Sequence, residues 1–284
     1  MPLSTKAKIS IAKMAHRMVC FPRKVLGMGS QIVVTRNGLR WELDLNEGID
    51  FAIFLLGMFE RQTVNAYRRM IRPGDVVFDI GANIGAHTLH FAQSVGSHGQ
   101  VVAFEPTDFA FSKLLRNVSR NPTLAPRIRA EQAMCVATQG ELAPGRLYSS
   151  WPLIQHAELH GKHYGKLKDT SGARTVTLDG YLQGSDVQRV SFIKIDVDGY
   201  EVDVLLGSLN TLHRFKPTLI MELAPYTLEE RGSSIDKLLE ILVSAKYTIR
   251  TLADNRIFPQ NPDAIRALLP PGRSLNIQAK PADA

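Results

Sequence analysis

Hydrophobic and polar positions along the chain follow two different periods, and each period predicts a type of element. Residues 31–35 and 39–45 alternate apolar and polar side chains on either side of Arg36-Asn37-Gly38, which predicts a β-hairpin with a tight turn. The large apolar residues that begin at Phe51 then follow helical spacing toward Met70. We therefore expect a hairpin and a helix here, and we expect both to cover one end of a sheet.

The longer central part of the chain alternates short apolar runs with helical spacing. The apolar runs lie at residues 76–80, 100–104, 191–195 and 216–223. Such alternation predicts an α/β fold with a doubly wound, mostly parallel sheet and helices on both faces. Beyond this part, the pattern predicts a helix at residues 235–245 and strands at residues 247–252, 257–258 and 275–280.

The segment Val76-Val77-Phe78-Asp79-Ile80-Gly81-Ala82-Asn83-Ile84-Gly85 predicts a buried strand that ends in a glycine turn and opens into a helix. This arrangement is typical of nucleotide cofactors, because glycine lets the backbone pass close to a ligand. The loop lacks the Gly-Lys-Ser/Thr ending of phosphate-binding loops and the third glycine of the dinucleotide fingerprint. A motif of S-adenosylmethionine enzymes remains, in which Asp79 can face the cationic methionine end of the cofactor.

A second acid supports this interpretation. Residues 100–106 predict the next strand, and Glu105 lies at its carboxyl end, 20 residues after Gly85. An acid in this place can accept hydrogen bonds from both ribose hydroxyls of a nucleotide. Either segment alone is also compatible with a structural turn, but their order and spacing favour a cofactor site.

Residues 191–201 predict a strand that ends in Asp196-Val197-Asp198-Gly199, followed by a leucine-rich helix through Leu212 and a strand at residues 216–223. At this point the chain resembles a known family. Over residues 49–225, segments of this chain resemble, in order, the successive motifs of FkbM-family S-adenosylmethionine-dependent methyltransferases. These segments are Phe78–Gly85, Phe104–Pro106, Thr177–Leu182, Ile193–Glu201 with Gly207, and Lys216–Glu222. The resemblance implies a Rossmann-like class I methyltransferase fold with S-adenosylmethionine as cofactor.

The expected cofactor-binding residues are Asp79, Gly81, Asn83, Gly85, Thr88, Glu105 and Asp196. The family often has an acid before a glycine in the loop after the third strand, where it reaches the adenine amino group. Counting back from Gly140, this position holds Ala137. The resemblance therefore implies less about the adenine contacts than about the rest of the cofactor.

Strand alternation places Lys194 and Asp196 on the same face, and a lysine inside an apolar strand requires a buried partner. Glu222, at the carboxyl end of the next strand, can be that partner. The cofactor would bring the reactive methyl group, so the protein must align an acceptor hydroxyl and remove its proton. We expect Asp196 to be the base, with Asp198 and Glu222 as alternates, and Lys194 to fix their geometry.

Two other roles for these carboxylates stay open. Any two of the three could hold a divalent cation that acidifies the hydroxyl, although no metal motif is present. Asp196 and Glu222 could instead only orient strand ends and bind the amine of the cofactor. We expect Glu201 to buttress the start of its helix, where a carboxylate complements the helix dipole.

Composition agrees with one enzyme-sized domain. The chain has 284 residues, of which 44% are hydrophobic, and this is enough to bury a large core. Cys20 and Cys135 form neither a C-x-x-C pair nor a metal-ligand spacing, so the sequence favours a reducing, cytoplasmic location. No window of about 18 apolar residues predicts a transmembrane helix.

The net charge of +7 is concentrated at the start of the chain. Residues 1–41 contain eight basic residues and no acid, whereas the rest has 26 bases and 27 acids. Within residues 1–24, Ile11, Met14, Ala15, Met18 and Val19 share one face of a predicted basic amphipathic helix. This leader could pack on the domain or stay solvated, contact an anionic membrane surface at the inner face, or serve as a targeting peptide. Nucleic-acid binding is disfavoured, because no reading module is present.

Residues 138–175 show little periodicity and are rich in histidine and aromatic residues. An insertion after a strand end surrounds the ligand crevice in α/β sheets, so we expect an acceptor-side lid. His156, His160 and His163 have the spacing of one helical face, which would suit a metal site. Gly161 weakens such a helix and no zinc motif is complete, so contact with solvent or substrate is favoured over metal binding.

The sequence thus predicts three parts: a leader at residues 1–24, a hairpin and helix cap at residues 25–73, and a methyltransferase core at residues 74–284. The resemblance implies an O-methyltransferase acting on a hydroxyl of a sugar, glycan, or glycosylated or polyketide natural product. One alternative is N-methylation of a small amine. Another is a cofactor-binding module without catalysis that attaches to a membrane or a partner protein.

Overall fold

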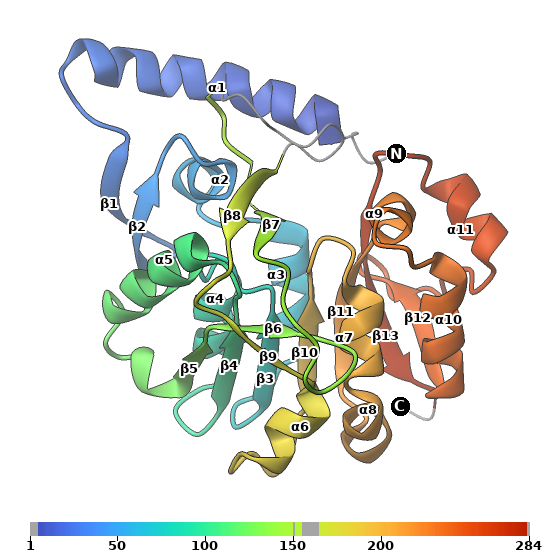
Figure 1. Cartoon of the computed structure of the whole chain (residues 1–284). Coiled ribbons are helices and arrows are strands. Elements are labelled where there is room, and N and C mark those ends of the chain that lie inside the picture. The colour runs from blue at the N-terminus through green and yellow to red at the C-terminus, as the bar shows by residue number, and fades with distance from the viewer. Residues whose placement is uncertain (1–4, 150, 155–164, 283–284) are drawn as a thin grey trace.

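The computed structural model describes residues 5–149, 151–154 and 165–282, which form a central seven-stranded sheet with helices around it (Figure 1). The strands lie in the order β12-β13-β11-β10-β3-β4-β5. Neighbours from β11 to β5 are parallel, whereas β13 is antiparallel to both β11 and β12. The bounds are β3 Val76–Ile80, β4 Gln100–Phe104, β5 Ile128–Glu131, β10 Phe192–Ile195, β11 Thr218–Leu223, β12 Tyr247–Thr251 and β13 Leu275–Pro281. The expected doubly wound, mostly parallel sheet is confirmed.

Helices follow most strands of the sheet, as the alternating pattern predicts. Their bounds are α4 Thr88–Ser94, α5 Asp108–Ser119, α6 Leu178–Gln183, α7 Glu201–Leu206, α8 Leu209–Phe215, α9 Pro225–Glu230, α10 Ile235–Ser244 and α11 Pro262–Leu268, with a 3-10 turn at Ala125–Arg127. Because consecutive parallel strands need crossover connections, the helices lie over the faces of the sheet.

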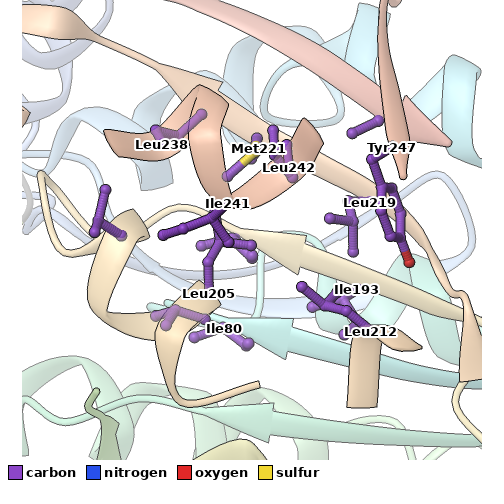
Figure 2. Close-up of a cluster of buried hydrophobic side chains, with 14 of the residues drawn as sticks. Ile80, Ile193, Leu205, Leu212, Leu219, Met221, Leu238, Ile241, Leu242 and Tyr247 are labelled. Atoms are coloured by element: carbon purple, nitrogen blue, oxygen red, sulfur yellow. The ribbon is translucent and has the colours of Figure 1, made fainter. Parts of the chain in front are cut away.

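Two hydrophobic clusters cover the two faces of the sheet, since alternate strand residues point to opposite sides. Phe78 and Ile193 belong to the first cluster, whereas their strand neighbours Val77 and Phe192 belong to the second. Figure 2 shows the first cluster, where side chains of α7, α8 and α10 lie over the strands: Leu205, Leu212, Leu238, Ile241 and Leu242. Each fully buried large apolar side chain contributes about 1.5–3 kcal/mol. This packing holds the strand ends in fixed positions.

The predicted hairpin is present. β1 Gln31–Arg36 and β2 Leu39–Asp44 pair antiparallel, and Arg36 lies opposite Leu39. The turn residues Asn37 and Gly38 have φ angles of 51° and 75°. Positive φ at both central residues is the signature of a tight primed turn, whose twist matches that of the strands.

The hairpin packs beside α5. The side-chain oxygens of Asn117 and Asn121 accept hydrogen bonds from the backbone N–H groups of Glu42 (2.8 Å) and Arg40 (2.9 Å). These bonds satisfy backbone groups on the open edge of β2. Leu39, Trp41 and Leu43 of β2 pack in the second cluster with residues of α4.

Three local expectations were wrong. The helix expected from Phe51 toward Met70 is divided into α2 Gly48–Leu56 and α3 Arg61–Tyr67, because Gly57 ends α2 in a left-handed conformation with φ 84°. The helix expected through Leu212 is divided into α7 and α8 at Gly207, where an added Cβ would lie 2.1 Å from the carbonyl oxygen of Val136. Residues 257–258 form no strand, and Ile257 makes an isolated bridge with Arg250.

The insertion at residues 138–175 contains more regular structure than its sequence pattern predicts. β7 Arg146–Ser149 and β8 Lys166–Asp169 form an antiparallel hairpin. β9 Arg174–Val176 pairs in parallel with β6 Ala133–Cys135. The histidines 156, 160 and 163 of the predicted helical face lie outside the described residues.

The basic start of the chain forms α1 Thr5–Val25, which lies across the top of the view in Figure 1. Ala12, Ala15 and Val19 pack in a third cluster with Leu45 and Phe51. The helix is therefore seated on the body of the domain. Among the helices that the structure describes, none is long and apolar enough to cross a membrane.

Candidate active site

Two adjoining pockets open where β3, β4, β10 and β11 end. The first, here called the β4-side pocket, is lined among others by Glu105, Thr107, Met134 and Tyr148. The second, the β11-side pocket, is lined among others by Glu60, His87, Trp151, Lys194, Glu222 and Tyr226. Five residues line both pockets: Gly81, Asn83, Ser149, Asp196 and Asp198. The pockets are therefore parts of one site, and Asp196 lies where they meet.

The two glycines of the turn after β3 are required by packing. Gly81 and Gly85 have φ angles of 79° and 88°. A Cβ atom on Gly81 would lie 1.8 Å from the carbonyl oxygen of Asp196, and one on Gly85 would lie 2.8 Å from a side-chain carbon of Leu114. Gly81 thus lets the end of β10 approach the turn and also lines both pockets, whereas Gly85 seats the turn against α5.

Glu105 lies at the carboxyl end of β4 and is 3% exposed. Its Oε1 accepts hydrogen bonds from the backbone N–H (2.9 Å) and the hydroxyl (2.5 Å) of Thr107, and its Oε2 accepts one from the N–H of Asn83 (2.9 Å). Burial raises the pKa of Glu105, and the bonds from Thr107 and Asn83 oppose that rise. A carboxylate accepts about four hydrogen bonds. Capacity therefore remains for a ligand hydroxyl in the β4-side pocket.

Asp79 and Thr88 are placed differently from our expectation of direct cofactor contact. Asp79 is fully buried, and its Oδ2 accepts a hydrogen bond of 2.6 Å from the Thr88 hydroxyl. Neither residue is among those that line the two described pockets. Burial raises the pKa of Asp79, and the nearby Lys194 ammonium opposes that rise. Both residues therefore lie behind the pocket wall, where Oδ1 of Asp79 is 4.0 Å from the Lys194 ammonium.

Lys194 is buried in β10 and joins two carboxylates. Its Nζ lies 3.0 Å from Oδ2 of Asp196 and 4.0 Å from Oδ1 of Asp79. Burial lowers the pKa of Lys194, but Asp196, Asp79 and Glu60 raise it more, to about 12. We expected Glu222 to be the partner of Lys194, and this was wrong. Among the described residues, the ion pairs of Lys194 are with Asp196 and Asp79.

Three further carboxyl groups lie around Asp196 and have raised pKa values. Burial, and then repulsion from Asp196, raise the pKa of Asp198 to about 7 and that of Glu222 to about 8. The same two causes raise the pKa of Glu60. A nearby cation would favour the ionised form of these carboxyl groups, so the site favours a cationic ligand. No cluster of three or more potential ligands suits a metal ion in the described part of the chain, so the divalent cation that the sequence left open is not supported.

Glu60 and His87 of the β11-side pocket are among the residues that sequence reasoning missed. The His87 Nε2 lies 3.7 Å from Oε2 of Glu60, and it has no hydrogen-bond partner among the described residues. Burial, and then the Lys194 ammonium, lower the pKa of His87 well below its usual value, so the imidazole is neutral. The sequence signal that could have identified His87 is its position directly after the glycine turn. Glu60 comes from the break between α2 and α3, where no motif marks it.

Glu201 has the structural role that we expected. Its Oε1 accepts hydrogen bonds from the backbone N–H groups of Val197 (3.3 Å) and Gly199 (3.4 Å), just before α7 begins. Burial, and then repulsion from Glu222, raise the pKa of Glu201 to about 8. The side chain therefore holds the loop that carries Asp198 rather than reaching a ligand.

The insertion that we expected to be a lid supplies walls to both pockets. Leu147 and Tyr148 line the β4-side pocket, Trp151 lines the β11-side pocket, and Ser149 lines both. The β4-side pocket also contacts Ala133, Met134 and Cys135 of β6, which form an apolar surface. Ala137, the residue at the position of the family's acid, is not among the residues that line it.

Residues 79–249 match the family described as the methyltransferase FkbM domain. A relative of known activity is the hexuronic acid methyltransferase AglP of Haloferax volcanii, which is 27% identical over 153 residues. The alignment covers 54% of this chain, and the chain spans 58% of the length of that relative.

Two solved structures have a similar arrangement of elements. A methyltransferase FkbM from Methylobacillus flagellatus KT is 15% identical, with 83% of this chain and 60% of that chain covered and a TM-score of 0.44. An S-adenosylmethionine-dependent O-methyltransferase from Thermotoga maritima is 13% identical, with 91% and 80% covered and a TM-score of 0.46.

Proposed function

This chain belongs to the FkbM family of S-adenosylmethionine-dependent methyltransferases, and we propose that it methylates a hydroxyl of a sugar, glycan, or glycosylated or polyketide natural product. One observation carries this proposal. The carboxylate of Asp196 lines both the β4-side and the β11-side pocket, so it lies between a place for the cofactor and a place for an acceptor.

The residues of the β4-side pocket fit S-adenosylmethionine. Glu105 would hold the ribose hydroxyls, because its buried carboxylate retains acceptor capacity. The apolar surface of β6 would cover the adenine ring, and the carboxylates of Asp196 and Asp198 would attract the cationic methionine end. When bound, this cofactor supplies an electrophilic methyl group on a sulfonium centre.

Asp196 is the proposed base for the acceptor hydroxyl, and Lys194 is its positioning residue. A base must reach the proton that it accepts, and Asp196 borders the β11-side pocket while its Oδ2 is held 3.0 Å from the Lys194 ammonium. Asp198 and Glu222, with pKa values raised to about 7 and about 8, carry a proton for much of the time at neutral pH. Both also line the β11-side pocket, but among the described residues the Lys194 ammonium pairs with Asp196 and not with them, so they are the alternates for the base.

The acceptor class rests on the relative and on the family. AglP is a hexuronic acid methyltransferase, and this supports a sugar as the acceptor of the present chain. A small amine is the second candidate, because Glu60, Asp198 and Glu222 place acidic groups around the β11-side pocket. Those acids would attract an ammonium group, whereas they would repel an acceptor that carries its own carboxylate.

The direct test is methyl transfer from S-adenosylmethionine carrying a labelled methyl group to a panel of neutral glycans, uronic acids and amines. We expect label on neutral sugar hydroxyls as ethers that survive mild alkali, and we expect chelators to leave the rate unchanged. Product analysis by mass spectrometry and alkaline hydrolysis distinguishes ethers, esters and methylamines. Label found only on amines would replace this function by the second candidate.

A further inference from the structure

One side of α1 exposes a row of large apolar side chains. Ile11, Met14, Met18, Phe21 and Val25 recur at steps of three and four, so they form one stripe along the helix. Met18, Phe21 and Val25 are 74%, 70% and 71% exposed. Soluble proteins seldom expose several large apolar side chains in one contiguous patch, so this stripe is unusual.

The stripe is separate from the face by which α1 packs on the domain. Ala12, Ala15 and Val19 pack against Leu45 and Phe51. The His16 ring also contacts Phe51, with 5.4 Å between ring centroids. The sequence pattern placed Ala15 and Val19 on one face with Met14 and Met18, but the structure divides them. The helix is thus anchored by its small residues and presents its large ones outward.

A line of basic residues runs beside the stripe. Lys13, Arg17 and Lys24 are spaced by four and seven residues, so they lie on one side of the helix, about 100° around its axis from the stripe. Together with Arg23, and with Phe21 of the stripe, they line a hollow at the side of α1, and no acidic residue is among the described residues that line it. The first 41 residues contain no acid at all. Cationic and apolar groups therefore share one exposed side of the molecule.

We propose that this side of α1 docks on an anionic phospholipid surface. An interfacial helix places its apolar row at the boundary of headgroups and acyl chains, while flanking lysines and arginines contact the headgroups. Charge complementarity distinguishes this occupant from a second copy of the chain, because pairing two copies of α1 would bring like charges together. The proposal is independent of the acceptor and of the methyl transfer.

Vesicle binding by the full chain tests the proposal. Co-sedimentation is measured with phosphatidylcholine vesicles, with and without phosphatidylglycerol. We expect binding only to the anionic vesicles, and we expect added salt to weaken it. The stripe variant M14N/M18N/F21N and the charge variant R17Q/K24Q should each reduce the partition coefficient by at least about tenfold.

Matched controls place asparagine at exposed leucines elsewhere. Leu142 and Leu268 are 89% and 52% exposed, and the double variant L142N/L268N should bind like the unaltered chain. Circular dichroism checks each fold, and M18N alone replaces the stripe variant if that variant does not fold. Equal binding to neutral vesicles, unchanged binding of the stripe variant, or absence of binding would each overturn the proposal. So would a dimer in sedimentation analysis that the stripe substitutions dissociate.

Discussion

Asp196→Asn is expected to lower the turnover of methyl transfer by about two to four orders of magnitude, while the affinity for the cofactor changes little. Asparagine preserves the size of the side chain and can still bond to its surroundings, but it cannot accept the hydroxyl proton. The Lys194 ammonium, now 3.0 Å from Oδ2 of Asp196, keeps Asp79 as a partner. The measurement is single-turnover methyl transfer, together with calorimetric titration of the cofactor product S-adenosylhomocysteine.

Asp186→Asn is a suitable control, because the Asp186 side chain is 87% exposed and lies away from both pockets. It should leave both turnover and affinity unchanged. A proportional loss of turnover and cofactor affinity in Asp196→Asn would make Asp196 a binding group. The base would then be sought at His87, whose neutral imidazole lines the β11-side pocket, or among the histidines of residues 156–163.

Lys194→Met is expected to lower the free energy of unfolding by about 3–5 kcal/mol, because it leaves buried carboxylates without their cation. Asp79 is the more affected partner, since it is fully buried and Asp196 is partly exposed. Adding Asp79→Asn to Lys194→Met removes the unpaired charge, so the double variant should recover part of the loss. Urea unfolding of the single and double variants measures this coupling.

The decrease in the free energy of unfolding caused by Lys194→Met should depend on pH in a defined direction. Burial already raises the pKa of Asp79, and removal of Lys194 takes away the charge that opposes this rise. A carboxyl group with a raised folded-state pKa destabilises the fold as pH increases through that pKa. The loss should therefore be smaller at about pH 5 than at about pH 8. A pH-independent loss, or a double variant no more stable than Lys194→Met, would show that Lys194 acts through packing alone.

The sequence predicted the elements that depend on local pattern. Apolar runs and turn glycines located β3, β4, β10 and β11, and placed Glu105 and Asp196 at strand ends. The partner of Lys194 depended on strand order, which local pattern does not define. In the sheet β10 lies between β3 and β11, with Lys194 opposite Asp79 on one side and Ile220 on the other. Glu222 is two residues farther along, so Asp79 is the nearer carboxylate.

Residues contributed by other parts of the fold were also beyond local pattern. Glu60 reaches the β11-side pocket from the break after α2, and Asn276 of β13 donates it a hydrogen bond of 2.7 Å. Such a contact joins residues 216 positions apart, and no spacing rule predicts it. The sequence pattern also did not separate the buried apolar row of α1 from the exposed one, because only packing decides which row is buried.

The β4-side pocket should bind S-adenosylmethionine, and a direct binding measurement can establish this. Isothermal calorimetry and thermal unfolding with S-adenosylmethionine, S-adenosylhomocysteine and NADH should show binding of the first two only. Ligand at 100 times its dissociation constant stabilises the fold by about 2.7 kcal/mol. Glu105→Ala should remove that stabilisation, whereas Asp186→Asn should retain it. Stabilisation by NADH, with no stabilisation by S-adenosylmethionine, would contradict this assignment.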